Sequence, residues 1–177
     1  ESSAASDVYK RQGEPNLLPR SYHSGASEDL AEIVSHLRAQ RPLAPLYAVG
    51  YSLGGNVLLK YLGESGVASQ LEAAAAVSVP FRLDHCADRI GQGFSKVYQA
   101  HFMREMLAYV QLKQRHFHDQ GQHEQLATLE RLGQLTNLRT FWDFDGKVTA
   151  PLNGFRDAHD YYPVSYTHLT LPTTPYV

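Results

Sequence analysis

The residues best suited to chemistry lie in one short stretch, Gly50-Tyr51-Ser52-Leu53-Gly54. The pattern G-x-S-x-G is typical of a nucleophile elbow, a sharp turn from a strand to a helix that holds a serine in a strained backbone conformation. Because a helix begins there, the serine lies beside backbone N–H groups that have no helical partner, and the N–H of Leu53 can stabilise an oxyanion. The pattern therefore predicts that the Ser52 hydroxyl attacks a carbonyl carbon.

The glycines of this stretch have a steric interpretation. We expect a side chain at position 50 or 54 to collide with the neighbouring backbone where strand and helix cross, and Gly55 to relieve the first helical turn in the same way. The bare pattern also arises by chance in very roughly one chain in twenty of this length. Its position between an apolar run and a helical pattern favours the elbow over a chance match.

The elements that would position Ser52 are visible as periodic patterns. Residues 46–49 form an apolar run that predicts a buried strand, and a second apolar run covers residues 74–79. A helical pattern runs from Ser52 to Gly63 between them, and an amphipathic helix with Ser27 as its N-cap precedes them. The apolar face of that first helix consists of Leu30, Ile33, Val34 and Leu37. Helix alternating with strand predicts a parallel α/β sheet.

The second half of the chain has a different pattern. Residues 94–135 predict two or three amphipathic helices with no strand between them. We place a domain boundary near Asp84, with a partial α/β core over residues 13–84 and a helical region over residues 85–163.

Both ends of the chain differ from the middle. Residues 1–12 and 164–177 have no helical period, and both resemble translated sequencing-adapter sequence rather than protein. We exclude them from the fold. The stretch between them is then expected to be a fragment that is cut at both ends.

Composition narrows the function classes. The 16 basic and 18 acidic residues give a formal net charge of −2, which offers no electrostatic footprint for nucleic acid. Cys86 is the only cysteine, so a reducing, cytoplasmic compartment is expected. No apolar run approaches the roughly 20 residues that span a bilayer. We expect no transmembrane segment in this chain, and membrane association through an upstream segment stays open.

Seven short motifs occur in an order that resembles the YheT-like hydrolases, the AB hydrolase 4 family of the α/β-hydrolase superfamily. They are GEPN (13–16), YHSG (22–25), GYSLGGN (50–56), SVPF (78–81), GFSKVYQ (93–99), FDGKVTAPLNGF (144–155) and DYY (160–162). The resemblance covers residues 13–162 and implies an α/β-hydrolase fold with a helical cap. It also implies that Ser52 is the nucleophile and the Leu53 N–H an oxyanion donor. The implied substrates are carboxylic esters, either short-chain esters or monoacylglycerols, and no metal or organic cofactor is needed.

The same resemblance implies where the other catalytic groups lie. The triad Asp and His belong to loops beyond the helical cap, and a second oxyanion donor belongs to a His-Gly-type loop before Gly13. We expect these residues to be absent from this chain, which would then be inactive alone. Some acidic and histidine residues after Ser52 could be mistaken for triad members: Asp143, Asp145, Asp157, His159 and Asp160. We favour structural roles for them, because geometry and not chain order defines a triad.

Other candidate residues have ordinary interpretations. A histidine cluster lies at His116, His118 and His123. Its spacing is not H-E-x-x-H, which favours a solvated helix face over a metal site. For His23 we expect a turn hydrogen bond or satisfied packing. Four aromatic residues could line an acyl pocket or form the core of the helical region, and their helical spacing favours the core: Phe94, Tyr98, Phe102 and Tyr109.

Three functions remain open at this point. Hydrolysis of an ester through an acyl-enzyme is the prediction. Acyl transfer to an alcohol uses the same fold and nucleophile, and a non-catalytic binding or scaffold protein would retain only the fold.

Overall fold

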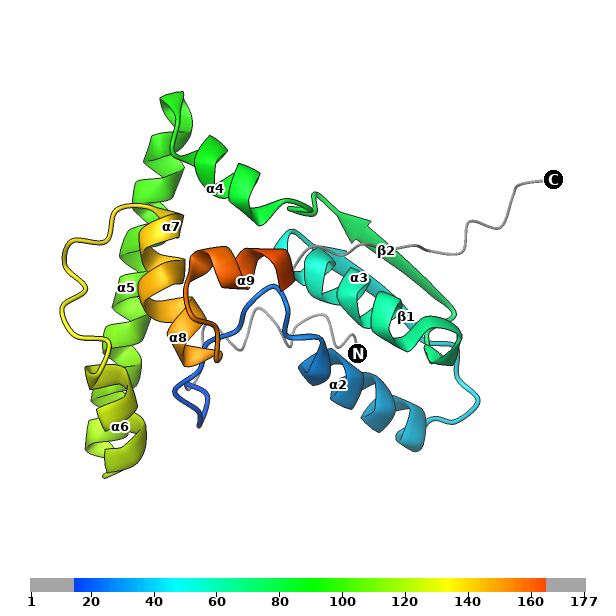
Figure 1. Ribbon diagram of the computed structural model, residues 1–177. Coiled ribbons are helices and arrows are strands. Elements are labelled where there is room, and N and C mark those ends of the chain that lie inside the picture. The colour runs from blue at the N-terminus through cyan, green and yellow to red at the C-terminus, as the bar shows by residue number, and fades with distance from the viewer. Residues whose placement is uncertain (1–14, 165–177) are drawn as a thin grey trace. The chain divides into compact units, whose positions relative to one another are not determined.

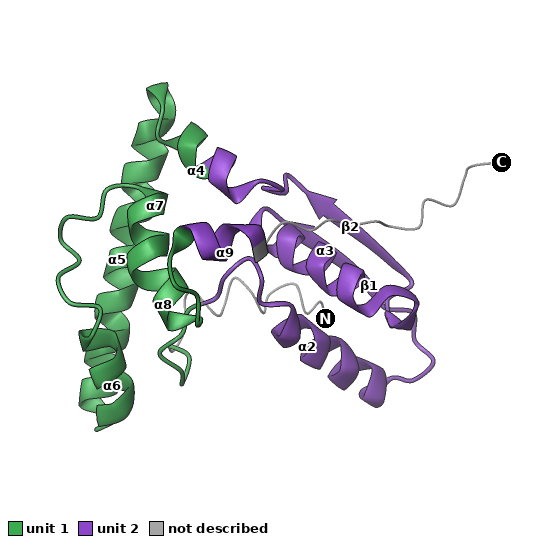
Figure 2. Ribbon diagram, viewed as in Figure 1, with its two compact units in different colours: residues 1–21, 87–158 green, residues 22–86, 159–177 purple. Residues whose placement is uncertain are grey.

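The computed structural model describes residues 15–164, which form two compact units (Figure 2). The sheet unit comprises residues 22–86 and 159–164, and the helical unit comprises residues 15–21 and 87–158. The division after Cys86 lies near the boundary predicted at Asp84. Except for Val164, the adapter-like stretches lie outside the described residues.

The sheet unit contains a two-stranded parallel sheet, as predicted. Strand β1 (Tyr47–Tyr51) pairs with β2 (Ala73–Val77), in a register that runs from Tyr47 opposite Ala73 to Tyr51 opposite Val77. The crossover between them consists of α3 (Leu53–Ser65) and η1 (Gly66–Ala68). Helix α3 packs against both strands, and α2 (Ser27–Gln40) packs against α3 (Figure 1). This arrangement is consistent with the partial α/β-hydrolase fold that the resemblance implies, and a helical part accompanies it.

The prediction that the first strand is buried is wrong. Tyr47, Val49 and Tyr51 alternate along one face of β1, and their side chains are 69%, 60% and 68% exposed. Every residue of β2 is exposed as well. The physical reason is that α3 covers one face of the pair, while within residues 15–164 nothing covers the other face to a similar extent.

Two predicted helix ends are also wrong. Ser27 is the first helical residue and makes no cap; its hydroxyl instead donates to Glu64 Oε2 at 2.5 Å, which ties α2 to α3. Helix α3 does not end at Gly63, as predicted, but continues for two more residues to Ser65. The helix ends before Gly66, whose φ of 50° and N–H bond to the Leu62 carbonyl close the last turn.

The helical unit is built around one long helix. Two helices, α5 (Lys96–Asp119) and α6 (His123–Glu130), confirm the two or three helices predicted for residues 94–135. The remaining segments are α4 (Leu83–Ile90, which begins in the sheet unit), η2 (Gly93–Ser95), α7 (Phe141–Phe144), the π-helical η3 (Asp145–Thr149) and α8 (Ala150–Leu152). Helix α9 (Ala158–Val164) returns the chain to the sheet unit.

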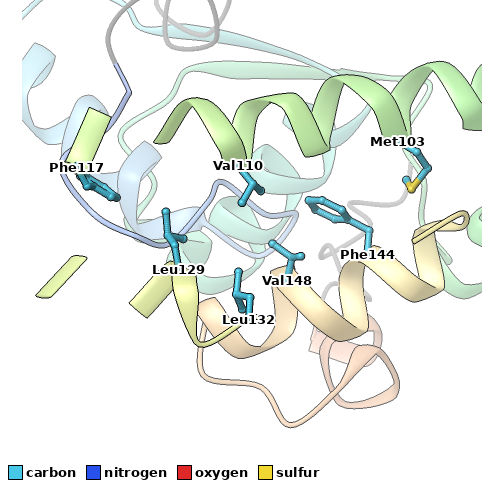
Figure 3. Packing of buried hydrophobic residues seen from close by; sticks show 7 residues of the cluster. All are labelled: Met103, Val110, Phe117, Leu129, Leu132, Phe144 and Val148. Atoms are coloured by element: carbon cyan, nitrogen blue, oxygen red, sulfur yellow. The ribbon is translucent and has the colours of Figure 1, made fainter. Parts of the chain in front are cut away.

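The core of the helical unit comes from residues two helical turns apart on α5. Figure 3 shows Met103, Val110 and Phe117 facing residues of α6, α7 and η3. The other members of this cluster are Leu129, Leu132, Phe144 and Val148. The expectation that the aromatic residues form this core is wrong for Phe94 and Tyr98, which are 86% and 62% exposed, and Phe102 is 41% exposed. Phe94 lies in η2, before α5 begins, and Phe102 lies at the edge of the core, where its ring contacts that of Phe141 with 6.0 Å between centroids.

A buried lysine fixes the start of the helical unit. Lys113 on α5 has no exposed surface, and its Nζ donates to three consecutive backbone carbonyls, those of Leu18, Pro19 and Arg20, at 2.6, 2.8 and 2.9 Å. Burial lowers the pKa of Lys113 to about 8. Residues 18–20 are therefore held against α5 by one side chain.

None of the helices within residues 15–164 combines the length and the apolar character that a membrane-crossing helix needs.

Candidate active site

Ser52 lies at the turn between β1 and α3, in the strand–turn–helix context that the motif requires. Its backbone has φ 50° and ψ −119°, a conformation that is costly for a residue with a side chain. Two hydrogen bonds hold it there. The Ser52 N–H donates to the Val77 carbonyl on β2 at 2.9 Å, and the Ser52 carbonyl accepts from the Asn56 N–H at 3.2 Å.

The Ser52 side chain is exposed and does not cap α3. Within the described sheet unit its hydroxyl makes no hydrogen bond, to a histidine or to any other group. Leu53 is the first residue of α3, so its N–H has no carbonyl one turn earlier in the helix. The turn thus presents a hydroxyl next to a backbone donor at the positive end of a helix.

The steric role of the glycines is confirmed at two positions and wrong at a third. A Cβ on Gly50 would lie 2.6 Å from the Gly54 carbonyl oxygen, and one on Gly55 would lie 2.7 Å from Val79 Cγ2. A Cβ on Gly54 would have nothing within 4 Å. The first turn of α3 brings the carbonyl of Gly54 against Gly50, while the Cα hydrogens of Gly54 face open space.

Two family motifs meet behind the turn. Asn56, from GYSLGGN, is fully buried, and its Nδ2 donates to the carbonyl of Pro80, from SVPF, at 3.0 Å. Val79 of the same segment packs on Gly55. Sequence reasoning did not single out Asn56; the available signal was a polar amide directly before the apolar residues Val57 and Leu58, both of which are buried.

Two more motifs meet at the start of the sheet unit. The hydroxyl of Tyr161, from DYY, accepts from the Ser24 N–H at 3.0 Å and lies 2.8 Å from the Ser24 hydroxyl. The expected turn hydrogen bond of His23 is confirmed, since its Nδ1 accepts from the Gly25 N–H at 3.1 Å. The His23 ring also contacts the ring of Tyr161 edge-on, with 5.6 Å between centroids. YHSG and DYY therefore form a structural tie.

Asp143 and Asp145, two of the residues weighed as triad members, have local partners in the helical unit. Asp143 forms a capping box with Thr140 at the start of α7. Burial acts to raise the pKa of Asp143, but hydrogen bonds from Arg139 and Thr140 outweigh it and lower that pKa. Asp145 accepts from the Thr149 hydroxyl at 2.7 Å. His159 and Asp157 are exposed, Asp160 is half-buried, and each of the three has an interaction partner.

The histidine cluster lies at the end of α5 and the start of α6. His118 and His123 are exposed and His116 is half-buried, and His118 Nδ1 lies 3.2 Å from its neighbour Asp119. Among residues 15–164 no three His, Cys, Asp or Glu side chains gather closely enough to hold a metal ion.

Several curated proteins are similar to this chain along most of its length. The Escherichia coli (strain K12) protein named "Putative esterase YheT" is 38% identical over 151 residues, which are 85% of this chain and 42% of that protein. The mouse phospholipase ABHD3 is 32% identical over 150 residues, 85% of this chain and 34% of its own length. The Saccharomyces cerevisiae monoacylglycerol lipase is 29% identical over 169 residues, 90% of this chain and 35% of its own length.

The chain thus spans between about a third and two fifths of the length of these relatives. No family model matches it. No solved structure matches it. The relatives share the α/β-hydrolase character that the elbow, the parallel strand pair and the paired motifs also indicate. The chain belongs to the YheT-like family of α/β hydrolases.

Proposed function

We propose that Ser52 is the nucleophile of a serine hydrolase that acts on carboxylic esters, with short-chain esters or monoacylglycerols as substrates. The observation that carries this proposal is the conformation of Ser52, which has a positive φ at the strand–helix turn and an exposed hydroxyl. The names of the relatives, which are an esterase, a phospholipase and a monoacylglycerol lipase, support an ester or lipid as the substrate. With a single cysteine in the chain, we place the reaction in the cytoplasm.

The proposed reaction proceeds through an acyl-enzyme. The Ser52 Oγ attacks the carbonyl carbon of the ester, and the Leu53 N–H donates to the oxyanion that forms. A histidine held by an aspartate takes the Ser52 proton and returns it to the departing alcohol. Water, activated by the same histidine, then releases the acid and restores Ser52.

We propose that this histidine and aspartate belong to parts of the full-length protein outside this chain, as does a second oxyanion donor. The family resemblance supports this, and so do the hydrogen bonds that occupy Asp143 and Asp145 in the helical unit. Without its base, Ser52 is a weak nucleophile. The 177-residue chain alone is therefore expected to be inactive.

The test uses the full-length protein, recovered by sequencing the source template past the codons for Gln12 and Pro163. A fluorophosphonate probe should label it at Ser52, and Ser52→Ala should abolish both labelling and ester hydrolysis. Ser35→Ala, which changes an exposed serine on α2, is the matched control and should leave both unchanged.

Other outcomes would favour the alternatives. Acyl product that accumulates only when an acceptor alcohol is present would indicate an acyltransferase with the same nucleophile. A wild-type protein that resists the probe and hydrolyses no ester would refute the proposal and favour a binding or scaffold protein.

A further inference from the structure

A second serine lies beside the nucleophile. Ser52 directly follows β1 and Ser78 directly follows β2, and the last residues of the two strands, Tyr51 and Val77, are register partners. The Ser52 N–H donates to the carbonyl of Val77, the residue before Ser78. Neighbouring strands lie about 4.8 Å apart, so the two serines emerge side by side at the carboxyl end of the sheet. In open α/β sheets, ligands bind at this end.

Both serines have the same unusual backbone. Ser52 and Ser78 have φ values of 50° and 54°, and within residues 15–164 they are the two non-glycine residues with positive φ. Serine is strained in this region, whereas glycine is not. Strain of this kind persists only where the surrounding structure imposes it, and it gathers at functional sites. The strain at Ser52 is explained by the elbow, and that at Ser78 requires its own explanation.

The segment after Ser78 is anchored to the helix that begins at the nucleophile. Val79 packs on Gly55, and the carbonyl of Pro80 accepts from the buried Asn56 side chain at 3.0 Å. The Phe81 N–H closes a tight turn onto the Val79 carbonyl at 3.0 Å. Ser78 itself stays exposed, and its hydroxyl makes no hydrogen bond within the part of the chain that the structure describes. The anchoring therefore sets the position of Ser78 and leaves its hydroxyl available.

We propose that the Ser78 hydroxyl binds a free hydroxyl on the alcohol portion of the ester, as in a monoacylglycerol; this inference rests on the proposed role of Ser52. The oxygens of an ester group only accept hydrogen bonds, and the Leu53 N–H can serve the carbonyl oxygen. A substrate hydroxyl both donates and accepts, and a serine hydroxyl does the same.

The test compares two substrates with the same acyl chain in the full-length protein. Ser78→Ala should lower kcat/KM about fivefold for the monoacylglycerol and less than about twofold for the methyl ester, since one neutral hydrogen bond is lost with the first substrate alone. Ser78→Gly also lacks the hydroxyl, but glycine adopts a positive φ without strain. It should therefore show the same selective loss of kcat/KM for the monoacylglycerol, with a higher Tm than Ser78→Ala. Ser35→Ala should leave kcat/KM unchanged for both substrates.

The remaining outcomes separate this inference from the proposed function. An equal loss for both esters, or no loss for either, in Ser78→Ala and Ser78→Gly would overturn the role of Ser78, while the role of Ser52 would stand. Hydrolysis that survives in Ser52→Ala would overturn both. A loss for the monoacylglycerol in Ser78→Ala that Ser78→Gly restores would assign the effect to the backbone and would also overturn the role of the hydroxyl.

Discussion

The two units differ in how they bury their apolar residues. In the helical unit, α5, α6, α7 and η3 close around a shared core, in which Phe117 and Val148 have no exposed surface. In the sheet unit, the buried apolar residues lie mainly on the helices, as Val57 and Leu58 do, whereas β1 presents tyrosine and valine side chains to solvent. The turn that carries Ser52 lies in the sheet unit.

This difference follows from the way helices and strands satisfy their backbone hydrogen bonds and cover their apolar faces. A helix completes its backbone hydrogen bonds internally and needs one covered face, so a few helices can form a core together. A parallel strand needs a neighbour at each edge and cover on both faces. The turn at Ser52 needs fewer neighbours than the sheet does, because within the described residues its backbone is hydrogen-bonded only to β2 and to the first turn of α3. The conformation of Ser52 thus depends on nearby residues, whereas the stability of the sheet depends on how its exposed face is covered.

The largest expected difference between the two units comes from shortening one apolar side chain in each. Phe117→Ala should lower the free energy of unfolding by about 3–5 kcal/mol, because it empties a fully buried site. Val49→Ala on β1, where the side chain is 60% exposed, should cost less than about 1 kcal/mol in the isolated chain. Urea denaturation measures both. An equal cost at the two positions would show that β1 is covered in solution.

The next largest effect on the free energy of unfolding is expected at Lys113. Lys113→Met removes the donor to three carbonyls and should cost about 2 kcal/mol at pH 7. Hydrogen exchange at residues 18–20 should accelerate in this variant and stay unchanged in Lys96→Met, which alters an exposed lysine on the same helix. Unchanged protection of residues 18–20 in Lys113→Met would contradict the anchoring role.

The pH dependence of this effect has a definite sign. Burial lowers the pKa of Lys113 from 10.5 to about 8, so between these values the unfolded chain binds the proton more tightly than the folded chain. The Lys113 contribution to the free energy of unfolding should therefore rise with pH from about 8 to about 10.5. Urea midpoints at pH 8 and pH 10, taken as the difference between wild type and Lys113→Met, measure this. A difference that falls with pH would refute the sign.

The glycines sharpen the description of the elbow. Gly50→Ala should destabilise the sheet unit by about 1–3 kcal/mol, because its Cβ would press on the Gly54 carbonyl, and in the full-length protein it should also slow labelling of Ser52 by a fluorophosphonate. Gly54→Ala has open space and should leave stability nearly unchanged. Thermal unfolding of the two variants provides the comparison, and a larger loss at Gly54 than at Gly50 would show that another segment packs on that side.

The smallest effect concerns the tie between two motifs. Tyr161→Phe removes the acceptor of the Ser24 N–H, which leaves a buried donor without that partner and should cost about 1–2 kcal/mol. Tyr47→Phe, at an exposed tyrosine of β1, is the matched control and should cost nothing measurable. Equal midpoints in urea for the two variants would mean that the tie contributes no stability.

Much of the architecture is encoded in short-range patterns. Alternating helix and strand periods determined the parallel α/β core, the spacing on residues 94–135 determined the helical unit, and Gly50-Tyr51-Ser52-Leu53-Gly54 determined the turn that carries Ser52. These features depend on residues within a turn or two of one another, so periodicity and steric rules reach them directly.

Only the tertiary structure decided the contacts between distant segments. It assigned the tight packing to Gly55 rather than Gly54, because Val79 arrives from β2. It paired Ser27 with Glu64, and it placed the strained Ser78 beside Ser52. In each case the partner lies more than twenty residues away, and its position depends on which strand or helix packs alongside. No local pattern in the chain contains that information.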